Sequence, residues 1–142
     1  MSKEMKIYTL GYGRLSFEDF LEILKEKGIK IVIDVRRFPT SKIPDFCKER
    51  LSEKLKEFGI AYAHIEELGG FRGGYERHMK SEEFKKGMRK LKKLAERKTS
   101  VIICVEENPA WCHRRYIAKE LKREGWEVIH IKPRRLARSK SH

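Results

Sequence analysis

A cysteine, a histidine and two arginines stand together in the run Cys112-His113-Arg114-Arg115. Cationic neighbours stabilise the thiolate form of a cysteine, and the thiolate is the nucleophile. Cys112 is therefore a candidate catalytic nucleophile, and the alternative is a small buried hydrophobic residue. The chain lacks the phosphatase-type loop in which an arginine follows the cysteine by six positions, since Ala110 and Ala118 stand six after Cys104 and Cys112.

The same run falls on the inward face of an expected helix. His113 and Arg114 precede the apolar Ile117 by four and three positions, which places all three on one side. A buried arginine needs an anionic partner, because burying its charge alone is costly. Asp34 and Glu106 are the nearest candidates, and both are also candidate acids or bases. Two interpretations stay open: an internal ion pair that holds the helix to the sheet, and a side chain that faces substrate.

Arginines and glycines in two other loops are candidates for binding an anion. Arg36 follows an expected strand, and Arg72 stands in a glycine-rich loop over residues 65–80. A guanidinium binds phosphate or carboxylate through two parallel hydrogen bonds, and glycines allow a close backbone approach to a ligand. The expected substrate-binding residues are Arg36, Arg72, Gly69, Gly70, His113 and Arg114.

No cofactor or metal is expected. Gly69-Gly70 does not form G-x-G-x-x-G and does not directly open a helix, so the dinucleotide fingerprint is absent. Cys112 and His113 are adjacent and the other histidines are scattered, so no metal-ligand spacing stands out.

Five apolar, β-like segments alternate with helical segments along the chain. Strands are expected at residues 6–10, 29–35, 60–65, 100–105 and 127–131. Helices are expected to begin after the N-cap residues Ser16, Ser81 and Asn108, and at about Lys48. This order predicts one α/β domain over residues 1–132, with a mostly parallel five-stranded sheet covered on both faces, and a basic tail over 133–142. The order of the strands in the sheet is not readable from the sequence.

The candidate residues fall where the expected strands end. Ligands of open α/β sheets bind outside the carboxyl ends of the strands. Asp34 and Arg36 follow the second strand, residues 69–72 follow the third, and Glu106 and residues 112–115 follow the fourth. One concave site at this edge is therefore expected.

Composition adds a charge argument. The net charge is +13, and five of these charges lie in the last eleven residues, which leaves about +8 on the body. A basic surface attracts phosphates, and a solvated lysine-rich surface is the alternative. Gln is absent and Asn108 is the only Asn, a Lys/Glu-rich composition that is typical of thermophile proteins.

A cytoplasmic location and no membrane partner are expected. No apolar run approaches the roughly 20 residues that span a bilayer, and the N-terminal residues lack the apolar region of a signal peptide. Three cysteines form no disulfide framework, which fits a reducing compartment.

Several of these motifs together resemble the family called domain of unknown function 488, roughly from Ile7 to Ile131. The matching pieces are Thr9-Leu10-Gly11-Tyr12-Gly13, Ile33-Asp34-Val35-Arg36 with Pro39, Glu67-Leu68-Gly69-Gly70 with Arg72, and Cys104-Val105-Glu106 through Pro109 to Cys112-His113-Arg114. Tyr12 departs from the pattern, in which a small polar residue or His is expected. The resemblance implies a Rossmann-like three-layer fold and supplies no activity, since the family is largely uncharacterised.

The leading hypothesis is an enzyme that acts on an anionic, phosphate-bearing or nucleotide substrate at the carboxyl edge of the sheet. Arg36, Arg72 and Arg114 would bind the anion, Asp34 or Glu106 would serve as acid or base, and Cys112 would be the nucleophile. One alternative is a non-catalytic nucleic-acid-binding module that uses the tail and a basic helix (Lys85, Lys86, Arg89, Lys90, Lys92, Lys93). The other is a structural or interaction protein. The oligomeric state is left open.

Overall fold

A computed structural model describes residues 5–38, 41, 43–69, 74–106 and 113–133 of the chain. The strands are β1 (Lys6–Gly11), β2 (Ile31–Asp34), β3 (Ala61–His64), β4 (Ser100–Cys104) and β5 (Glu127–His130). The α-helices are α1 (Phe17–Glu26), α2 (Lys48–Glu57), α3 (Tyr75–His78), α4 (Glu82–Arg97) and α5 (Arg114–Arg123). Two short 3₁₀ turns, η1 (Pro44–Phe46) and η2 (Glu66–Leu68), complete the described elements.

All five strands are parallel and lie in the order β3-β2-β4-β1-β5. The predicted Rossmann-like α/β fold with a five-stranded sheet is therefore confirmed. The order places β4 between β1 and β2, so three strands that are distant in sequence end side by side. The loops after β1, β2 and β4 consequently meet at one edge of the sheet.

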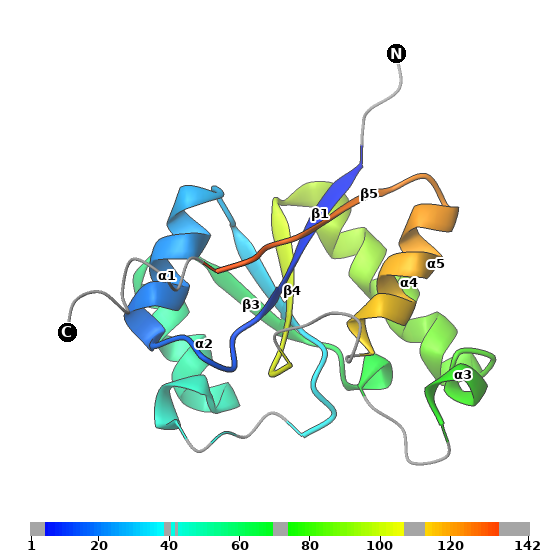
Figure 1. Cartoon of the computed structure of the whole chain (residues 1–142), viewed down its shortest axis with the longest axis horizontal. Helices are drawn as coiled ribbons and strands as arrows, with labels where there is room; N and C mark the ends of the chain where they lie inside the picture. Colours follow the sequence, from blue (N-terminus) through cyan, green and yellow to red (C-terminus); the bar gives the residue numbers. More distant parts are fainter. Residues whose placement is uncertain (1–4, 39–40, 42, 70–73, 107–112, 134–142) are drawn as a thin grey trace.

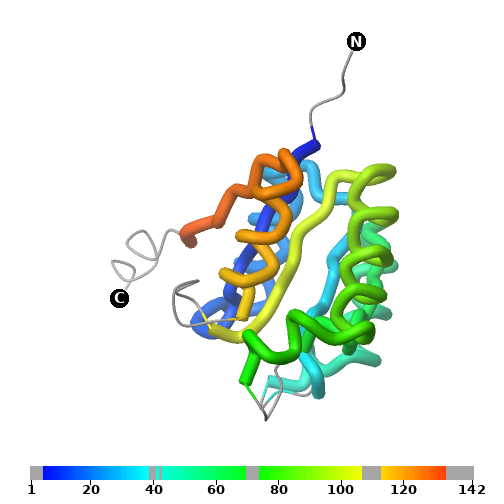
Figure 2. Tube along the Cα trace, turned by 90° about the vertical axis from the view of Figure 1, so that its right-hand side faces the viewer, coloured from blue at the N-terminus to red at the C-terminus, as the bar shows by residue number. Residues whose placement is uncertain are grey.

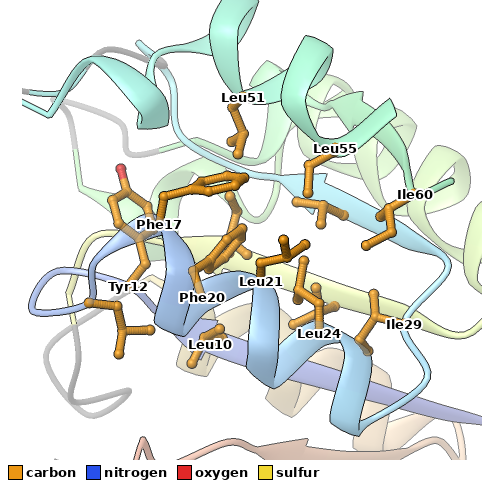
Figure 3. Close-up of a cluster of buried hydrophobic side chains, with 14 of the residues drawn as sticks. Leu10, Tyr12, Phe17, Phe20, Leu21, Leu24, Ile29, Leu51, Leu55 and Ile60 are labelled. Carbon is orange, nitrogen blue, oxygen red and sulfur yellow. The ribbon is translucent and has the colours of Figure 1, made fainter. Parts of the chain in front are cut away.

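Helices cover both faces of this sheet, α1 and α2 on one side and α4 and α5 on the other (Figure 1). Successive strand residues point to opposite faces, so each face has its own core. The α1/α2 face is packed by aromatic and leucine side chains around Phe20 and Leu55 (Figure 3). The α4/α5 face is packed by residues such as Ile33, Leu91 and Leu121. All four residues of β2 are buried, as expected of a strand covered on both faces.

The ends of the elements follow local signals. Ser16 and Ser81 are N-caps as predicted, and each side-chain Oγ accepts a hydrogen bond from a backbone N–H, of Asp19 and Phe84, at 3.1 Å. The second strand is shorter than the apolar run 29–35. Ile29 belongs to the end of α1, because its backbone N–H donates to Leu24 O at 2.9 Å. Asn108, the expected N-cap of the last helix, lies outside the described residues.

Two loop glycines allow the loops at the carboxyl edge to touch. A Cβ on Gly69 would lie 2.5 Å from Arg37 Cα, and one on Gly13 would lie 2.6 Å from Val105 O. Any side chain there would push the neighbouring backbone away. The loop after β3 is therefore packed against the loop after β2, and the loop after β1 against the loop after β4.

The described helices include none with the length and apolarity needed to cross a membrane.

Replacing Ser16 with Ala should lower the free energy of unfolding by about 1 kcal/mol, because the N–H of Asp19 loses its partner. Ser16→Asp should retain the wild-type value, since its carboxylate caps the same helix end. Ser52→Ala in the middle of α2 is the control and should cost less than Ser16→Ala. Urea unfolding gives all four values, and equal stability of Ser16→Ala and wild type would contradict the cap assignment.

Candidate functional site

Two networks of buried polar side chains lie at the carboxyl end of the sheet, one on each face. The Arg36 network contains Arg36, Asp34, Tyr12 and Tyr62 and faces α1 and α2. The Arg114 network contains Arg114, Cys104, Thr9 and His130 and faces α4 and α5. Each network connects three strands, because its members come from different strands and their following loops.

In the Arg36 network a carboxylate and a guanidinium meet in a two-pronged ion pair. Arg36 Nε donates to Asp34 Oδ1 at 2.8 Å, and its terminal NH2 donates to Oδ2 at 2.6 Å. Arg36 NH1 donates to the hydroxyl of Tyr12 at 2.6 Å, and the Tyr62 hydroxyl donates to Asp34 Oδ2 at 2.5 Å. Asp34 is 0% exposed and Arg36 only 6%. The Asp34 carboxylate also accepts the backbone N–H of Arg36, so both of its oxygens are used.

Burial and mutual charge set the protonation of this network. Burial by itself lowers the pKa of the Arg36 guanidinium, but the hydrogen bonds and charge of Asp34 outweigh it, so the pKa is raised. Burial raises the pKa of Tyr12 to about 12, with Arg36 opposing the shift and Asp34 adding to it. Burial and the negative charge of Asp34 also raise the pKa of Tyr62. At neutral pH the network is therefore a closed ion pair with two neutral phenols.

The acceptors of Arg114 that lie among the described residues are neutral. Arg114 is 1% exposed, and its Nε donates to Cys104 Sγ at 2.9 Å and its NH1 to Thr9 Oγ1 at 2.8 Å. Its NH2 donates to the backbone carbonyl of Glu106 at 2.6 Å. This side chain thus ties α5 to β1, β4 and the loop after β4. Asp34, one of the expected partners of Arg114, bonds to Arg36 on the other face, and Glu106 meets Arg114 through its backbone.

The network continues from Arg114 to His130 on β5. Thr9 Oγ1 lies 2.6 Å from His130 Nδ1. The Thr9 hydroxyl accepts from Arg114 and still has its own proton to donate, which suits a neutral His130 whose Nδ1 accepts. Burial, followed by the charge of Arg114, holds the pKa of His130 below its usual value, in agreement with this assignment.

Two histidines hold the backbone that joins β2 to the following loop. His113 Nε2 donates to Val35 O at 3.1 Å, and His64 Nε2 donates to Arg36 O at 2.5 Å. A carbonyl only accepts, so Nε2 carries the proton in both rings. His64 comes from the end of β3 and His113 from the residue before α5, so this backbone is fixed from two elements.

The structure brings together Asp34, Arg36, Glu106, His113 and Arg114 of the predicted site, with Gly69 packed against the loop after β2. Arg36 and Arg114 are buried in the networks. Gly70, Arg72 and Cys112 lie outside the described residues, so their roles stay predictions.

Sequence reasoning missed Thr9, Tyr62, His64 and His130. The signal for His64 was available, since a histidine ends an expected strand. Thr9 and His130 are register partners on β1 and β5, and Asp34 and His64 are partners on β2 and β3. These pairings depend on strand order, which the sequence did not reveal.

A polar pocket of about 540 Å³ adjoins His64. Its lining carries both signs of charge: Lys48, Glu66, Glu67, Glu82, Glu83, Lys86 and Lys90. Lys90 Nζ donates to Glu67 Oε2 at 2.7 Å, and this bond holds the pKa of Glu67 below its usual value. Within the described part of the chain, no three His, Cys, Asp or Glu side chains are arranged to hold a metal ion.

Comparison with protein-family models places most of the chain in a known family. A family model described as "Domain of unknown function DUF488" matches residues 16–121. The matched residues include Asp34, Glu106 and Arg114, and the opening motif around Tyr12 precedes them. No curated protein and no solved structure matches the chain.

Removing the carboxylate of the Arg36 network should be strongly destabilising. Asp34→Asn leaves a buried guanidinium without its counter-charge, and we expect a loss of about 3–5 kcal/mol in the free energy of unfolding. Asp45→Asn is the matched control, because Asp45 also contacts two cations, Arg50 and Lys54, but at the surface. Denaturant unfolding of the two variants at neutral pH tests this. Equal losses in both would show that the buried pair has no special weight.

The buried phenol of Tyr12 should make stability fall at high pH. Between pH 10 and about 12 the unfolded chain releases this proton while the folded chain retains it, so the free energy of unfolding decreases as pH rises. The total loss from this group is about 2–3 kcal/mol. Tyr12→Phe removes the titrating group and retains the stacking on Phe46 at 4.3 Å. Denaturant unfolding from pH 9 to 12 should therefore give a shallower decline for Tyr12→Phe than for wild type, and parallel curves would contradict the assignment.

Proposed function

The chain belongs to the DUF488 family, and from this premise and the geometry of its carboxyl edge we propose that it is an enzyme acting on an anionic, phosphate-bearing substrate. The observation that carries the proposal is the burial of Arg36, just beyond β2, and of Arg114, the first residue of α5, which bonds to β1 and β4. Buried ion pairs seldom stabilise a fold more than apolar side chains of the same volume. Their position at the edge where parallel sheets bind ligands supports a role in function.

The charge of this edge favours an anion. The loops after β1 and β2 carry the described cations Arg14, Arg36 and Arg37, and Arg114 and Arg115 begin α5 after the β4 loop. The carboxylates of the same described loops and strand ends are Asp34 and Glu106, and Asp34 is neutralised by Arg36. An excess of positive charge at this edge attracts phosphate groups.

The two networks act as positioning devices in this proposal. The Asp34 carboxylate accepts four hydrogen bonds, so it holds Arg36 and Tyr62 in place and has no free oxygen to accept a substrate proton. Arg114 places the backbone of Glu106 through its bond to that carbonyl. Glu106, which is exposed, is the proposed acid or base.

Two further residues, Arg72 and Cys112, are assigned to the proposed site on the basis of the sequence. Arg72 is the proposed ligand of the substrate phosphate, and Cys112 is the proposed nucleophile. The nucleic-acid-binding module without catalysis is the competing function, and it needs neither Cys112 nor Glu106.

Binding of a phosphate-bearing probe tests the anion site. Arg72→Ala should weaken the binding of AMP at least tenfold, because a charge-assisted hydrogen bond to phosphate is lost. Arg97→Ala is the control, since Arg97 is exposed at the far end of α4. Isothermal titration calorimetry with AMP and with inorganic phosphate provides the affinities. Equal affinities of Arg72→Ala and wild type, or no binding to wild type, would count against the proposal.

Turnover separates the enzyme from the binding module. The probe is bis(p-nitrophenyl) phosphate, whose hydrolysis releases a coloured product. Glu106→Gln and Cys112→Ser should each lower kcat about a hundredfold or more. Glu96→Gln on the exposed surface of α4 and Cys47→Ser are the matched controls and should retain wild-type rates. Turnover that survives both site substitutions would remove these residues from the mechanism.

A further inference from the structure

A groove of about 750 Å³ runs between α4 and α5 on the face opposite α1 and α2. The two helices lie side by side over this face of the sheet (Figure 2). We call it the α4–α5 groove. Glu76 of α3 lines its beginning, and Arg123 and Glu124 at the end of α5 line its far part.

Six cations line the α4–α5 groove: Lys80, Lys85, Arg89, Lys92, Lys119 and Arg123. Helical rise places Lys85 and Arg89 about 6 Å apart along α4, with Lys92 about 4.5 Å further on. Lys119 and Arg123 are again about 6 Å apart along α5. The groove therefore presents a row of positive charge on each side, which matches a ligand with regularly repeated negative charge.

The carboxylates of the groove do not cancel this charge. The lining includes three of them, Glu76, Glu120 and Glu124. Glu124 Oε1 accepts from Lys92 Nζ at 2.7 Å, and Glu120 pairs with Arg123. Such surface pairs contribute little and exchange easily for a stronger anion. Lys80, Arg89 and Lys119 have no ion-pair partner within the described residues.

The rim of the groove is charged and its floor is partly apolar. Phe84 and Met88 are 2% and 4% exposed and belong to the core, whereas Met79 and Tyr116, which also line the groove, are half-buried. The six cations favour a phosphate backbone as the occupant, and the half-buried side chains offer apolar contact beside it.

The groove also reaches the candidate site. Tyr116 lines it, and the ring of Tyr75 lies 5.3 Å from that of Tyr116 and 5.3 Å from that of His113. His113 in turn bonds to Val35 O at the end of β2. A strand lying in the groove would therefore lead toward the loops that carry Glu106 and Arg36.

From this geometry we propose that the α4–α5 groove binds the phosphate backbone of single-stranded nucleic acid. The groove would then hold a polynucleotide whose end or internal phosphate enters the site. Only the assignment of that polynucleotide as the substrate rests on the proposed function. Binding in the groove itself needs no catalysis.

The test is the anisotropy of a labelled, twelve-nucleotide single-stranded RNA titrated with the full chain at several salt concentrations. Wild-type affinity should fall steeply between about 50 and 200 mM salt, because phosphate contacts release counterions. The double variant Arg89→Glu/Lys119→Glu should bind at least tenfold more weakly, with a salt slope smaller by about 1.4 for the two lost phosphate contacts.

The matched control is Lys30→Glu/Lys98→Glu, which changes net charge equally at exposed positions near the amino ends of β2 and β4. It should lose far less affinity than the groove variant. Equal losses in the two double variants, or a salt-independent wild-type affinity, would overturn the groove. Equal binding of an RNA duplex of the same length, or equally effective competition by poly-glutamate, would overturn the assignment to a single strand of nucleic acid.

Hydrolysis of bis(p-nitrophenyl) phosphate separates this inference from the proposed function. The groove variant should hydrolyse this small substrate at the wild-type rate. If the groove variant binds RNA weakly, the control variant binds it well and wild type shows no turnover, the groove is supported and the enzyme is rejected. If wild type shows turnover and the groove variant binds RNA as well as wild type does, the enzyme is supported and the groove is rejected.

Discussion

A guanidinium cannot be buried alone, and Arg36 is buried at the end of β2. Its charge requires the carboxylate of Asp34, two positions earlier, and the pair leaves Arg36 NH1 directed at Tyr12 on the loop after β1. Asp34 in turn accepts a hydrogen bond from the hydroxyl of Tyr62 on β3. One ion pair thus fixes the relative positions of three strand ends. The histidines that hold the carbonyls of Val35 and Arg36 add a second constraint on the same backbone.

The second buried arginine makes a similar connection on the other face. Arg114 connects α5 to β1 and β4 through Thr9 and Cys104. Because β4 lies between β1 and β2, both networks converge on the ends of the three central strands. The carboxyl edge is therefore rigid in its interior. Side chains that meet a ligand there must come from the loops beyond the networks.

The sequence predicted most of the fold and only part of this site. Strand and helix order, and the caps at Ser16 and Ser81, follow from local patterns and were confirmed. The partner of Arg114 could not be predicted, because side-chain alternation and strand order decide which carboxylates share its face. Asp34 was a candidate partner of Arg114 in the sequence, but it lies on the α1/α2 face and there accepts hydrogen bonds from Arg36. Tyr62 and His64 were missed for the same reason, since their role exists only where β3 borders β2.

Burial separates the arginines and lysines of this protein into two classes. Arg36 and Arg114 make their hydrogen bonds inside the protein, and the charge of Arg36 is balanced by Asp34, so both arginines act mainly by holding the loops of the edge. The groove cations lie at the surface, in exposed carboxylate pairs or, for Lys80, Arg89 and Lys119, with no ion-pair partner among the described residues. If the groove binds a phosphate backbone as proposed, these exposed rows on α4 and α5 make the contacts that salt displaces, and the buried arginines position the edge.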